Sequence, residues 1–177
     1  ASLISPRISK EVRGALFYAL AMNHACSTES QLSQTEEFLH TQIPITRAMG
    51  VRVESWEAGR LVLTAPLEIN HNHLGTAFGG SLAALATLAG YACLWLELGD
   101  RTAHVIIAES TLSYRRPVRG ELRAVCHRPE GEVLAAFKSA FAQTGKARVR
   151  LSVAVEGAQG TVAVEFSGTF VARRGGL

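Results

Sequence analysis

The sequence predicts an α+β fold in which an antiparallel sheet wraps around one long central helix. Residues 79–98 are small or apolar and carry no charge before Glu97, a composition that predicts a helix buried on all sides. Segments on both sides of this helix alternate apolar and polar residues with a period of two, as half-buried strands do. Short turns join these segments, which favours antiparallel pairing and a sheet packed on the helix.

Length and composition indicate one domain with an extension. At 177 residues, of which 47% are hydrophobic, the chain can bury a sizeable core. We divide it into an N-terminal helical extension and linker, residues 1–35, and a folded domain, residues 36–177. The net charge of +3 does not indicate a nucleic-acid partner. The 15 arginines against 3 lysines favour phosphate or carboxylate ligands, because the guanidinium fork binds both groups bidentately.

The first 26 residues allow two interpretations. Three cations precede the apolar run 14–22, an order that resembles a signal peptide. However, Glu11 lies among these cations, and apolar residues recur at helical spacing: Ile8, Val12, Ala15, Leu16, Ala19 and Leu20. We therefore expect an amphipathic surface helix from Ser9 to about Met22, followed by a polar linker over 27–34.

The other elements follow from the change between a period of 3.6 and a period of two. Glycines mark several of their ends, as Gly50, Gly99 and Gly145 do. We expect a short helix from 33 or 35 to about 40, a helical turn over 45–49, strands near 49–57 and 60–67 joined at Ala58-Gly59, the central helix over 79–98, strands over 104–114 and 119–127, a helix over about 130–144, strands over 147–156 and 161–172, and a frayed tail over 173–177.

The central helix is also long enough to cross a membrane. At about 1.5 Å per residue it would be roughly 30 Å long. Thr87, Tyr91 and Glu97 make it less apolar than a typical membrane span, and the segments on both sides have strand patterns. We therefore expect a core helix and no membrane partner.

Two glycines, Gly79 and Gly80, open this helix. The first backbone N–H groups of a helix have no intrahelical partner, and glycine side chains do not shield them. Such a terminus can bind an anion or a developing oxyanion. The alternative is that the glycines only allow the helix to pack closely against the sheet.

The three cysteines, Cys26, Cys93 and Cys126, are odd in number and widely spaced. They form no Cys-x-x-Cys pair and have no zinc-ligand spacing with histidine. We therefore expect reduced thiols in a cytoplasmic protein, with Cys93 inside the core helix.

The loop before the helix reads Asn-His-Leu-Gly-Thr-Ala-Phe-Gly-Gly over residues 72–80, and a later strand ends in Tyr-Arg-Arg-Pro-Val over 114–118. With the order of elements, these motifs resemble the hot-dog fold thioesterases over roughly residues 36–172. In the PaaI-like branch the loop typically reads Asn-x-x-Gly-x-x-His-Gly-Gly, and Phe78 stands here in the place of that histidine. The run Gly-Thr-Ala-Phe-Gly-Gly-Ser-Leu over 75–82 most resembles the C-terminal thioesterase domain of YiiD.

The resemblance implies a hot-dog fold, assembly as a homodimer or a dimer of dimers, and a site at the subunit interface beside the N-terminus of the central helix. Local physics agrees with this assembly. One sheet around one helix leaves an edge strand exposed, and pairing across a dimer would cover it.

The resemblance also directs attention to Thr87. Many hot-dog thioesterases carry an aspartate or glutamate in the central helix, about two turns past the glycines, as nucleophile or general base. Seven residues after Gly80 this chain has Thr87, which shares a helix face with Gly80. We predict that Thr87 lies below the free N–H groups; the alternative is a core threonine bonded to the carbonyl four residues back.

Asn72 and His73 complete the catalytic set with Gly80 and Thr87. The Asn72 amide can donate to a carbonyl without titrating, and it matches the family position; the alternative is a turn asparagine that bonds its own loop. His73 could serve as a general base. A second histidine two residues before it is weak evidence for a metal site without a third ligand, so we expect no metal and no cofactor.

Six residues are assigned to substrate binding. The arginines among them would contact the phosphates of coenzyme A or the acidic face of an acyl carrier protein, although a solvated surface is the alternative. The set is Phe78, Gly79, Ser81, Arg115, Arg116 and Arg119.

These residues and the resemblance predict a thioesterase acting on short acyl-CoA or acyl-carrier-protein thioesters. Hydrolysis needs an activated water or nucleophile, and Thr87 is not a carboxylate. Decarboxylation of a malonyl thioester needs only fixed donors for the enolate oxygen. The alternatives are therefore a malonyl-thioester decarboxylase supplying acetyl thioester for fatty acid initiation, to which members resembling the YiiD domain have been linked, and a non-catalytic acyl-thioester binding module.

Overall fold

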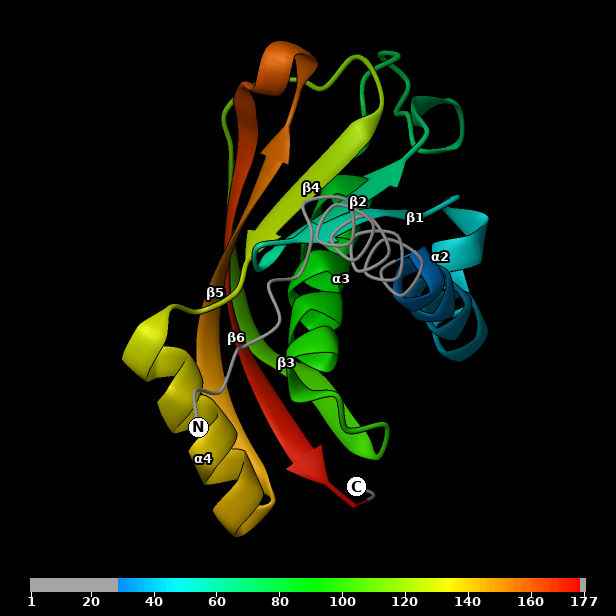
Figure 1. Cartoon of the computed structure of the whole chain (residues 1–177). Helices are drawn as coiled ribbons and strands as arrows, with labels where there is room; N and C mark the ends of the chain where they lie inside the picture. Colours follow the sequence, from blue (N-terminus) through cyan, green and yellow to red (C-terminus); the bar gives the residue numbers. More distant parts are fainter. Residues whose placement is uncertain (1–28, 176–177) are drawn as a thin grey trace, which may run out of the picture.

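A six-stranded antiparallel sheet curves around the central helix α3, Gly79–Leu98, with the strand order β1-β2-β4-β5-β6-β3 (Figure 1). The computed structural model describes residues 29–175, so the helix expected over 9–22 and Cys26 lie outside the described residues. The strands are β1 (Arg52–Glu57), β2 (Arg60–Ala65), β3 (Ala103–Tyr114), β4 (Leu122–His127), β5 (Lys146–Glu156) and β6 (Val162–Arg174). This is the hot-dog arrangement that the sequence predicts.

The inner face of the sheet and the sheet-facing side of α3 form the core. Leu85, Ala89 and Cys93 of α3 are fully buried against it. Gly90 faces Phe170 of β6 so closely that a Cβ atom on Gly90 would overlap the Phe170 ring. By length and composition α3 could cross a membrane, as no other helix within residues 29–175 could. In this fold its apolar side chains are core, as the sequence predicts.

One side of α3 is less buried than the sequence predicts. Ala83, Ala84, Thr87 and Tyr91 repeat at helical spacing and are only half-buried in the single chain. The prediction of burial on all sides is therefore wrong for this strip, because one sheet curves around only part of the helix circumference.

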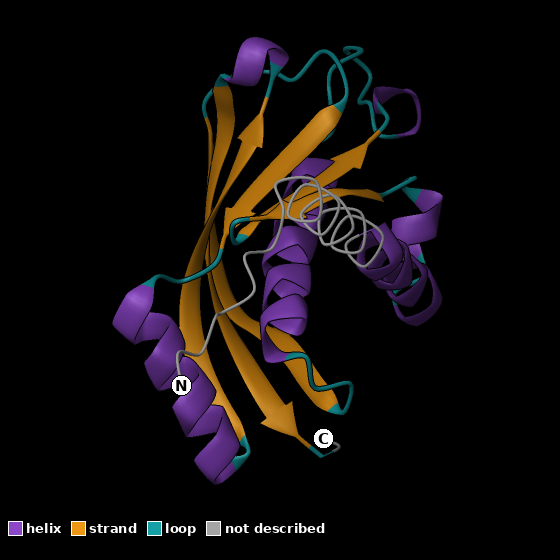
Figure 2. Ribbon diagram, in the orientation of Figure 1, coloured by secondary structure: helices purple, strands orange, loops and turns teal. Residues whose placement is uncertain are grey.

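Two helices flank this core in Figure 2, one beside α3 and one beside β5. The first covers residues 29–42, so the polar stretch 29–34, which we predicted as linker, is helical. The Phe38 ring stacks on Trp95 of α3 with centroids 4.5 Å apart, and Leu39 is buried. The helix begins earlier than we predicted because Leu32, Thr35 and Leu39 recur at helical spacing and share its buried side.

The second flanking helix, α4 (Gly131–Thr144), fills a gap in the sheet. β4 pairs with β5 only between Arg123↔Glu156 and Cys126↔Val153, so the first half of β5 has no strand on that side. α4 packs along β5 and buries Phe137 and Phe141. Its end at Gly145, with φ of 67°, is the left-handed cap that the sequence predicts.

The turns and short helices between the main elements are of the types that the sequence predicts, but some elements begin or end at other residues than predicted. The β1–β2 turn has positive φ at both Ala58 and Gly59, as a type I′ turn requires. A short helix α2 (Ile45–Ala48) precedes β1, and 3-10 turns cover Leu67–Ile69 and Ala158–Gly160. The strand predicted from 119 begins only at Leu122, which leaves Arg119 in a loop.

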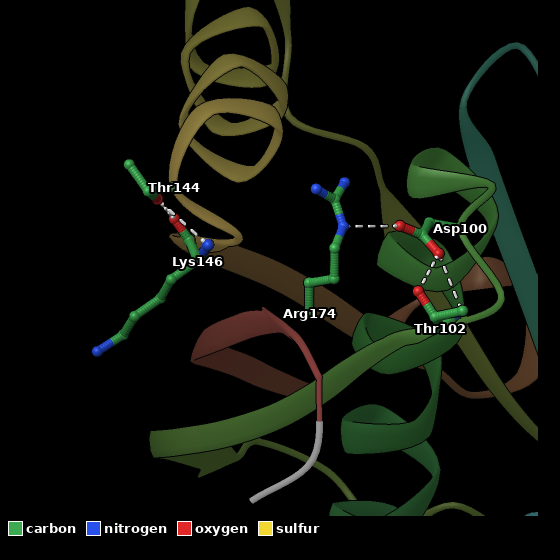
Figure 3. Close-up of polar contacts among 5 residues, drawn as sticks. All are labelled: Asp100, Thr102, Thr144, Lys146 and Arg174. Atoms are coloured by element: carbon green, nitrogen blue, oxygen red, sulfur yellow. Dashed lines mark hydrogen bonds and ion pairs between the residues drawn. The ribbon is translucent and has the colours of Figure 1, made fainter.

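The first two residues of the predicted frayed tail, Arg173 and Arg174, are instead part of the sheet, because β6 continues to Arg174 between two partners. Arg173 lies opposite Lys146 of β5, and Arg174 lies opposite Ala103 of β3. The Arg174 Nε donates to Asp100 Oδ2 at 3.4 Å, beside the C-terminal end of α3 (Figure 3). Long-range pairing therefore orders a segment whose local sequence gives no strand pattern.

Asp100 should make stability depend on acid pH. Hydrogen bonds from the Thr102 hydroxyl and backbone N–H, followed by the contact with Arg174, lower the pKa of Asp100 below its usual value. A lowered folded-state pKa contributes stability above the unfolded pKa, near pH 4, and the contribution disappears as pH falls through the folded value. Asp100→Asn should therefore lose less unfolding free energy than the wild type between about pH 6 and pH 3, measured by urea denaturation. Equal losses in both proteins would contradict this prediction.

Candidate active site

The N-terminus of α3 presents free backbone donors. Phe78 is the N-cap, and its side chain makes no capping bond. The first backbone bond of the helix joins the Leu82 N–H to the Phe78 carbonyl at 3.1 Å. Within residues 29–175, the N–H groups of Gly79, Gly80 and Ser81 have no acceptor. These three donors point out of the helix end and can hold an anion or oxyanion.

The preceding loop is fixed by Asn70, which the sequence analysis did not single out. Asn70 is 2% exposed, and its Nδ2 donates to the carbonyls of Met49 and Pro66, each at 2.8 Å. Its own carbonyl accepts from the Phe78 N–H at 2.8 Å. Asn70 thereby ties the start of α3 to the chain before β1. No local pattern marks it, because Met49, which is 21 residues away in the sequence, becomes its neighbour only in the folded chain.

Asn72 organises the outer part of the same loop. Its Oδ1 accepts from the Leu74 N–H at 2.9 Å and the Thr76 N–H at 3.3 Å. Its Nδ2 donates to the Thr76 hydroxyl at 3.0 Å. The amide is thus used within the loop, the arrangement that we gave as the alternative to a catalytic role. It leaves the catalytic assignment of Asn72 a prediction.

Thr87 lies within α3, seven residues after Gly80, whereas His73 lies on the loop before the free donors. The Thr87 hydroxyl donates to the Ala83 carbonyl at 2.9 Å on the half-buried strip of α3, the back-bonding that we gave as its alternative. His73 is exposed on the loop, and among the described residues nothing hydrogen-bonds to it. No group of three His, Cys, Asp or Glu side chains within residues 29–175 is arranged to hold a metal.

Two exposed aromatic rings flank the glycines. Phe78 is 56% exposed, and its ring lies over Gly80 so closely that a Cβ atom there would overlap it. On the other side, the Tyr114 hydroxyl at the end of β3 donates to the Gly79 carbonyl at 3.1 Å. Tyr114 entered the sequence analysis only as part of a motif. Its hydroxyl ties the strand-ending segment to the helix start.

A cavity of about 330 Å³ opens between the helix start and this strand end. Its lining contains no carboxylate and consists of Ala77, Gly79, Leu82, Tyr114, Arg115, Arg116 and Pro117. A second cavity of about 480 Å³ shares Arg116 and Pro117 with the first and adds Arg119 and Arg123. A larger hollow of about 570 Å³, which includes Ser152 and Ser167, lies elsewhere, on the outer face of the sheet. Because the two cavities share part of their lining, Gly79 at the helix start and the arginines lie along neighbouring hollows of the surface.

The arginines along these two cavities differ in their partners. Arg115 pairs with Glu165 at 2.9 Å. Arg123 pairs with Glu54 and Glu156, and the hydrogen bond to Glu54 raises its pKa further above the usual value. Arg116 and Arg119 are exposed and form no ion pair with any described residue. These two guanidinium groups are therefore available to an anionic ligand.

Comparisons with known proteins show the family to which the chain is similar and the fold that it shares with solved structures. A protein-family model described as "Putative thioesterase (yiiD_Cterm)" matches residues 32–174. A solved structure from Chlorobaculum tepidum TLS, of a protein of unknown function, is 31% identical, with a TM-score of 0.76, and the match covers 84% of this chain and 97% of that one. A structure described as a putative thioesterase, from Shewanella oneidensis, is 26% identical, with a TM-score of 0.73 and coverage of 82% and 99%. A structure described as a probable thioesterase, from Pseudomonas aeruginosa, is 26% identical, with a TM-score of 0.70 and coverage of 81% and 95%.

Proposed function

The chain belongs to the thioesterase family described by the yiiD_Cterm model, and from this premise we propose that it hydrolyses short acyl thioesters of coenzyme A or of an acyl carrier protein. One observation carries the proposal. Gly79, the first of three successive N–H groups at the start of α3 that have no acceptor within residues 29–175, lines a cavity that shares Arg116 with a second cavity lined by Arg119, and neither arginine forms an ion pair with a described residue. A substrate whose thioester carbonyl lies at the start of α3 would place the phosphate of its carrier near Arg116 and Arg119.

In this mechanism the thioester oxygen accepts hydrogen bonds from Gly79, Gly80 and Ser81. A water oxygen bonds to the carbonyl carbon, the water proton passes to a base, and the negative charge moves onto the oxygen that the N–H groups hold. The C–S bond then breaks, and the leaving thiolate takes a proton to give free thiol and acid. His73 is the candidate base, because it is exposed on the loop that leads into α3. Asn72 holds the loop that carries His73.

The absence of a carboxylate from the described lining of the cavity favours a second candidate function, malonyl-thioester decarboxylation. In that reaction the bond between the carboxylate and the α-carbon breaks, and CO₂ leaves. The electron pair forms an enolate whose oxygen the same N–H groups stabilise. A proton then adds to the α-carbon and gives an acetyl thioester. This route needs donors for an oxyanion but no base that activates water.

The deciding experiment incubates the protein with malonyl-, acetyl- and longer acyl-CoA and with the matching carrier-protein thioesters, and identifies products by mass. Free thiol with released acid would support the thioesterase. Acetyl thioester formed from malonyl thioester, with little free thiol, would support the decarboxylase. Neither product, with the Asn72→Ala and Thr87→Ala variants equally inert, would overturn both enzymes in favour of an acyl-thioester binding module.

Replacing both Arg116 and Arg119 with alanine should raise KM about thirtyfold for both carriers at low salt, because the substrate phosphates would lose two contacts worth about 1 kcal/mol each. The kcat should stay within about twofold, since neither group touches the reacting carbonyl in this proposal. Arg115→Ala is the comparison variant and should have a smaller effect, because Glu165 already holds that side chain. An unchanged KM at low salt would remove the arginines from the site.

We also propose a homodimer formed through β3, which could pair further into a dimer of dimers. β3 ends the sheet, its outer edge has no partner strand within residues 29–175, and Ile107 is 38% exposed there. The free buried thiols of Cys93 and Cys126 support a cytoplasmic location for this dimer.

Ile107→Glu should convert the dimer to monomers, because two carboxylates would meet near the symmetry axis and like charges across a strand pair repel. Sedimentation or light scattering would measure the mass. Ile45→Glu is the matched control, since Ile45 is 56% exposed on α2, away from β3. A dimer that survives Ile107→Glu unchanged would contradict pairing through β3.

A further inference from the structure

Four exposed cations gather on the outer face of the sheet, on β5 and β6. Lys146, Arg148 and Arg150 alternate along β5 on the outward side, because the residues between them, Ala147 and Val149, are buried on the inward side. We call these three residues together with Arg173 the cationic face. Lys146 and Arg150 are about 13 Å apart along the strand, at 3.3 Å per residue.

Sheet register completes this face. Arg173 of β6 lies directly opposite Lys146, and on the other side of Arg173 lies His104 of β3. Arg148 lies opposite Val171, which is half-buried. In Figure 3 the Lys146 side chain extends away from the Arg174–Asp100 pair, which marks the inward side. The cations therefore share one surface, with an apolar residue between them.

Among the residues that the structure describes, no carboxylate pairs with the cationic face. Within residues 29–175, none of its four members forms an ion pair, although Arg150 donates to the Ser167 hydroxyl at 2.8 Å. Glu109 is the nearest acid by register, and Thr169, which donates to it, separates it from Arg150. Like charges directly opposite in a strand pair destabilise a sheet. Such an unfavourable local arrangement is expected at a functional surface, where an anionic partner relieves the repulsion.

We propose that the cationic face docks an acidic acyl carrier protein, which delivers the acyl group to the site; this inference rests on the proposed function and names its carrier. A protein partner fits the surface because the cations are fixed on strands and interleaved with apolar Val171 and Ile106. Complementary charge of this kind accelerates association and sets orientation. The face offers no aromatic ring on which a nucleic-acid base could stack, as single-strand binders do.

The position of the cationic face indicates which site it serves. Arg174, next to Arg173, contacts Asp100 at the C-terminal end of α3, so the Arg173 end of the face lies about 30 Å from Gly79 along the helix. In a dimer with β3 paired antiparallel about its middle, the start of β3 in one copy would lie beside the end of β3 in the other copy. In this chain Tyr114 bonds to Gly79 at the helix start. The carrier docked on one subunit would therefore deliver its arm to the site of the other.

The test compares two carriers of one acyl group. The triple variant K146E/R148E/R150E should raise KM for the acyl-carrier-protein thioester at least tenfold at low salt, and the difference should shrink at high salt as screening increases. KM and kcat for the acyl-CoA thioester should stay within about twofold. Arg60→Glu, at the other end of the outer face, is a charge-reversal control and should change neither KM by more than about twofold.

The outcomes separate this proposal from the proposed function. Turnover of the acyl-CoA thioester without turnover of the acyl-carrier-protein thioester would overturn the docking proposal and leave the proposed enzymatic function intact. No turnover of either thioester would overturn the proposed function itself. Equal rises in both KM values would show a general effect of the triple variant and overturn docking. Loss of binding to duplex DNA or phosphatidylserine vesicles, with the carrier KM unchanged, would assign the face to those ligands instead.

A mixing experiment tests which site the face serves. The triple variant is combined in equal amounts with a subunit that carries wild-type cations and a disabled site, and the two are allowed to exchange. Delivery across the dimer predicts that acyl-carrier-protein activity returns, because the intact face of one subunit serves the intact site of the other. No recovery, with heterodimers present by native mass spectrometry, would overturn delivery between subunits.

Discussion

Replacing Phe170 with alanine should lower the free energy of unfolding by about 3–5 kcal/mol, the range for removal of a buried aromatic ring. Phe170 is 1% exposed and lies between Gly90 of α3 and Phe166 of β6. It therefore joins the central helix to the sheet, and its loss leaves a cavity that two rigid elements cannot close. Urea denaturation at neutral pH measures the change. Phe78→Ala is the control for stability, because that ring is 56% exposed and should cost less than about 0.5 kcal/mol.

A double-mutant cycle with Gly90 tests this contact directly. In the wild type, Gly90→Ala should destabilise by about 1–3 kcal/mol, because its Cβ would overlap the Phe170 ring. In the Phe170→Ala background the overlap is absent, and alanine favours a helix interior over glycine by about 1 kcal/mol. The sign of the Gly90→Ala effect should therefore reverse. If the effects of the two substitutions are additive, contact with Phe170 is not the reason that position 90 requires glycine.

The sequence predicts an element of this fold well where one residue pattern continues through the whole element. The central helix covers Gly79–Leu98 as expected, with Gly99 as its C-cap, because an uninterrupted run of small and apolar residues and the glycines at its ends define it locally. The polar stretch 29–34 was harder to interpret, because only Leu32 connects it to the buried side of its helix. The half-buried strip of α3 was not predictable, since composition indicates which residues are apolar but not how far a sheet wraps.

The candidate site was predictable only in part, for a related reason. Free N–H groups at Gly79 and Gly80 follow from a helix start without a capping side chain, which is local information. The difference between Arg115 and Arg116 is not local. Glu165, which pairs with Arg115, lies on β6 and is brought near by strand register. The sequence alone therefore does not distinguish Arg115, which forms an ion pair in the folded chain, from Arg116, which forms none with any described residue.

Removing the Gly80 N–H should lower kcat by about 10²–10³, the usual cost of losing one oxyanion donor. Gly80→Pro removes this donor, and because Gly80 is the second residue of α3 its N–H has no acceptor within the helix. Proline is tolerated in a first turn for that reason. The Phe78 ring lies over Gly80 and would overlap either replacement, so both variants are made in the Phe78→Ala background.

The decisive comparison is F78A/G80A against F78A/G80P, which differ in the backbone N–H and in the proline ring. If the Gly80 N–H holds the oxyanion, kcat should fall only in the proline variant, while KM changes little, because the donor matters most when charge has developed on the oxygen. The two proteins should have unfolding free energies within about 1 kcal/mol of each other. The fall applies to hydrolysis and to decarboxylation alike, since both place negative charge on the same oxygen. Equal kcat values in two folded proteins would mean that the start of α3 only packs against the sheet, and that the oxyanion is held elsewhere.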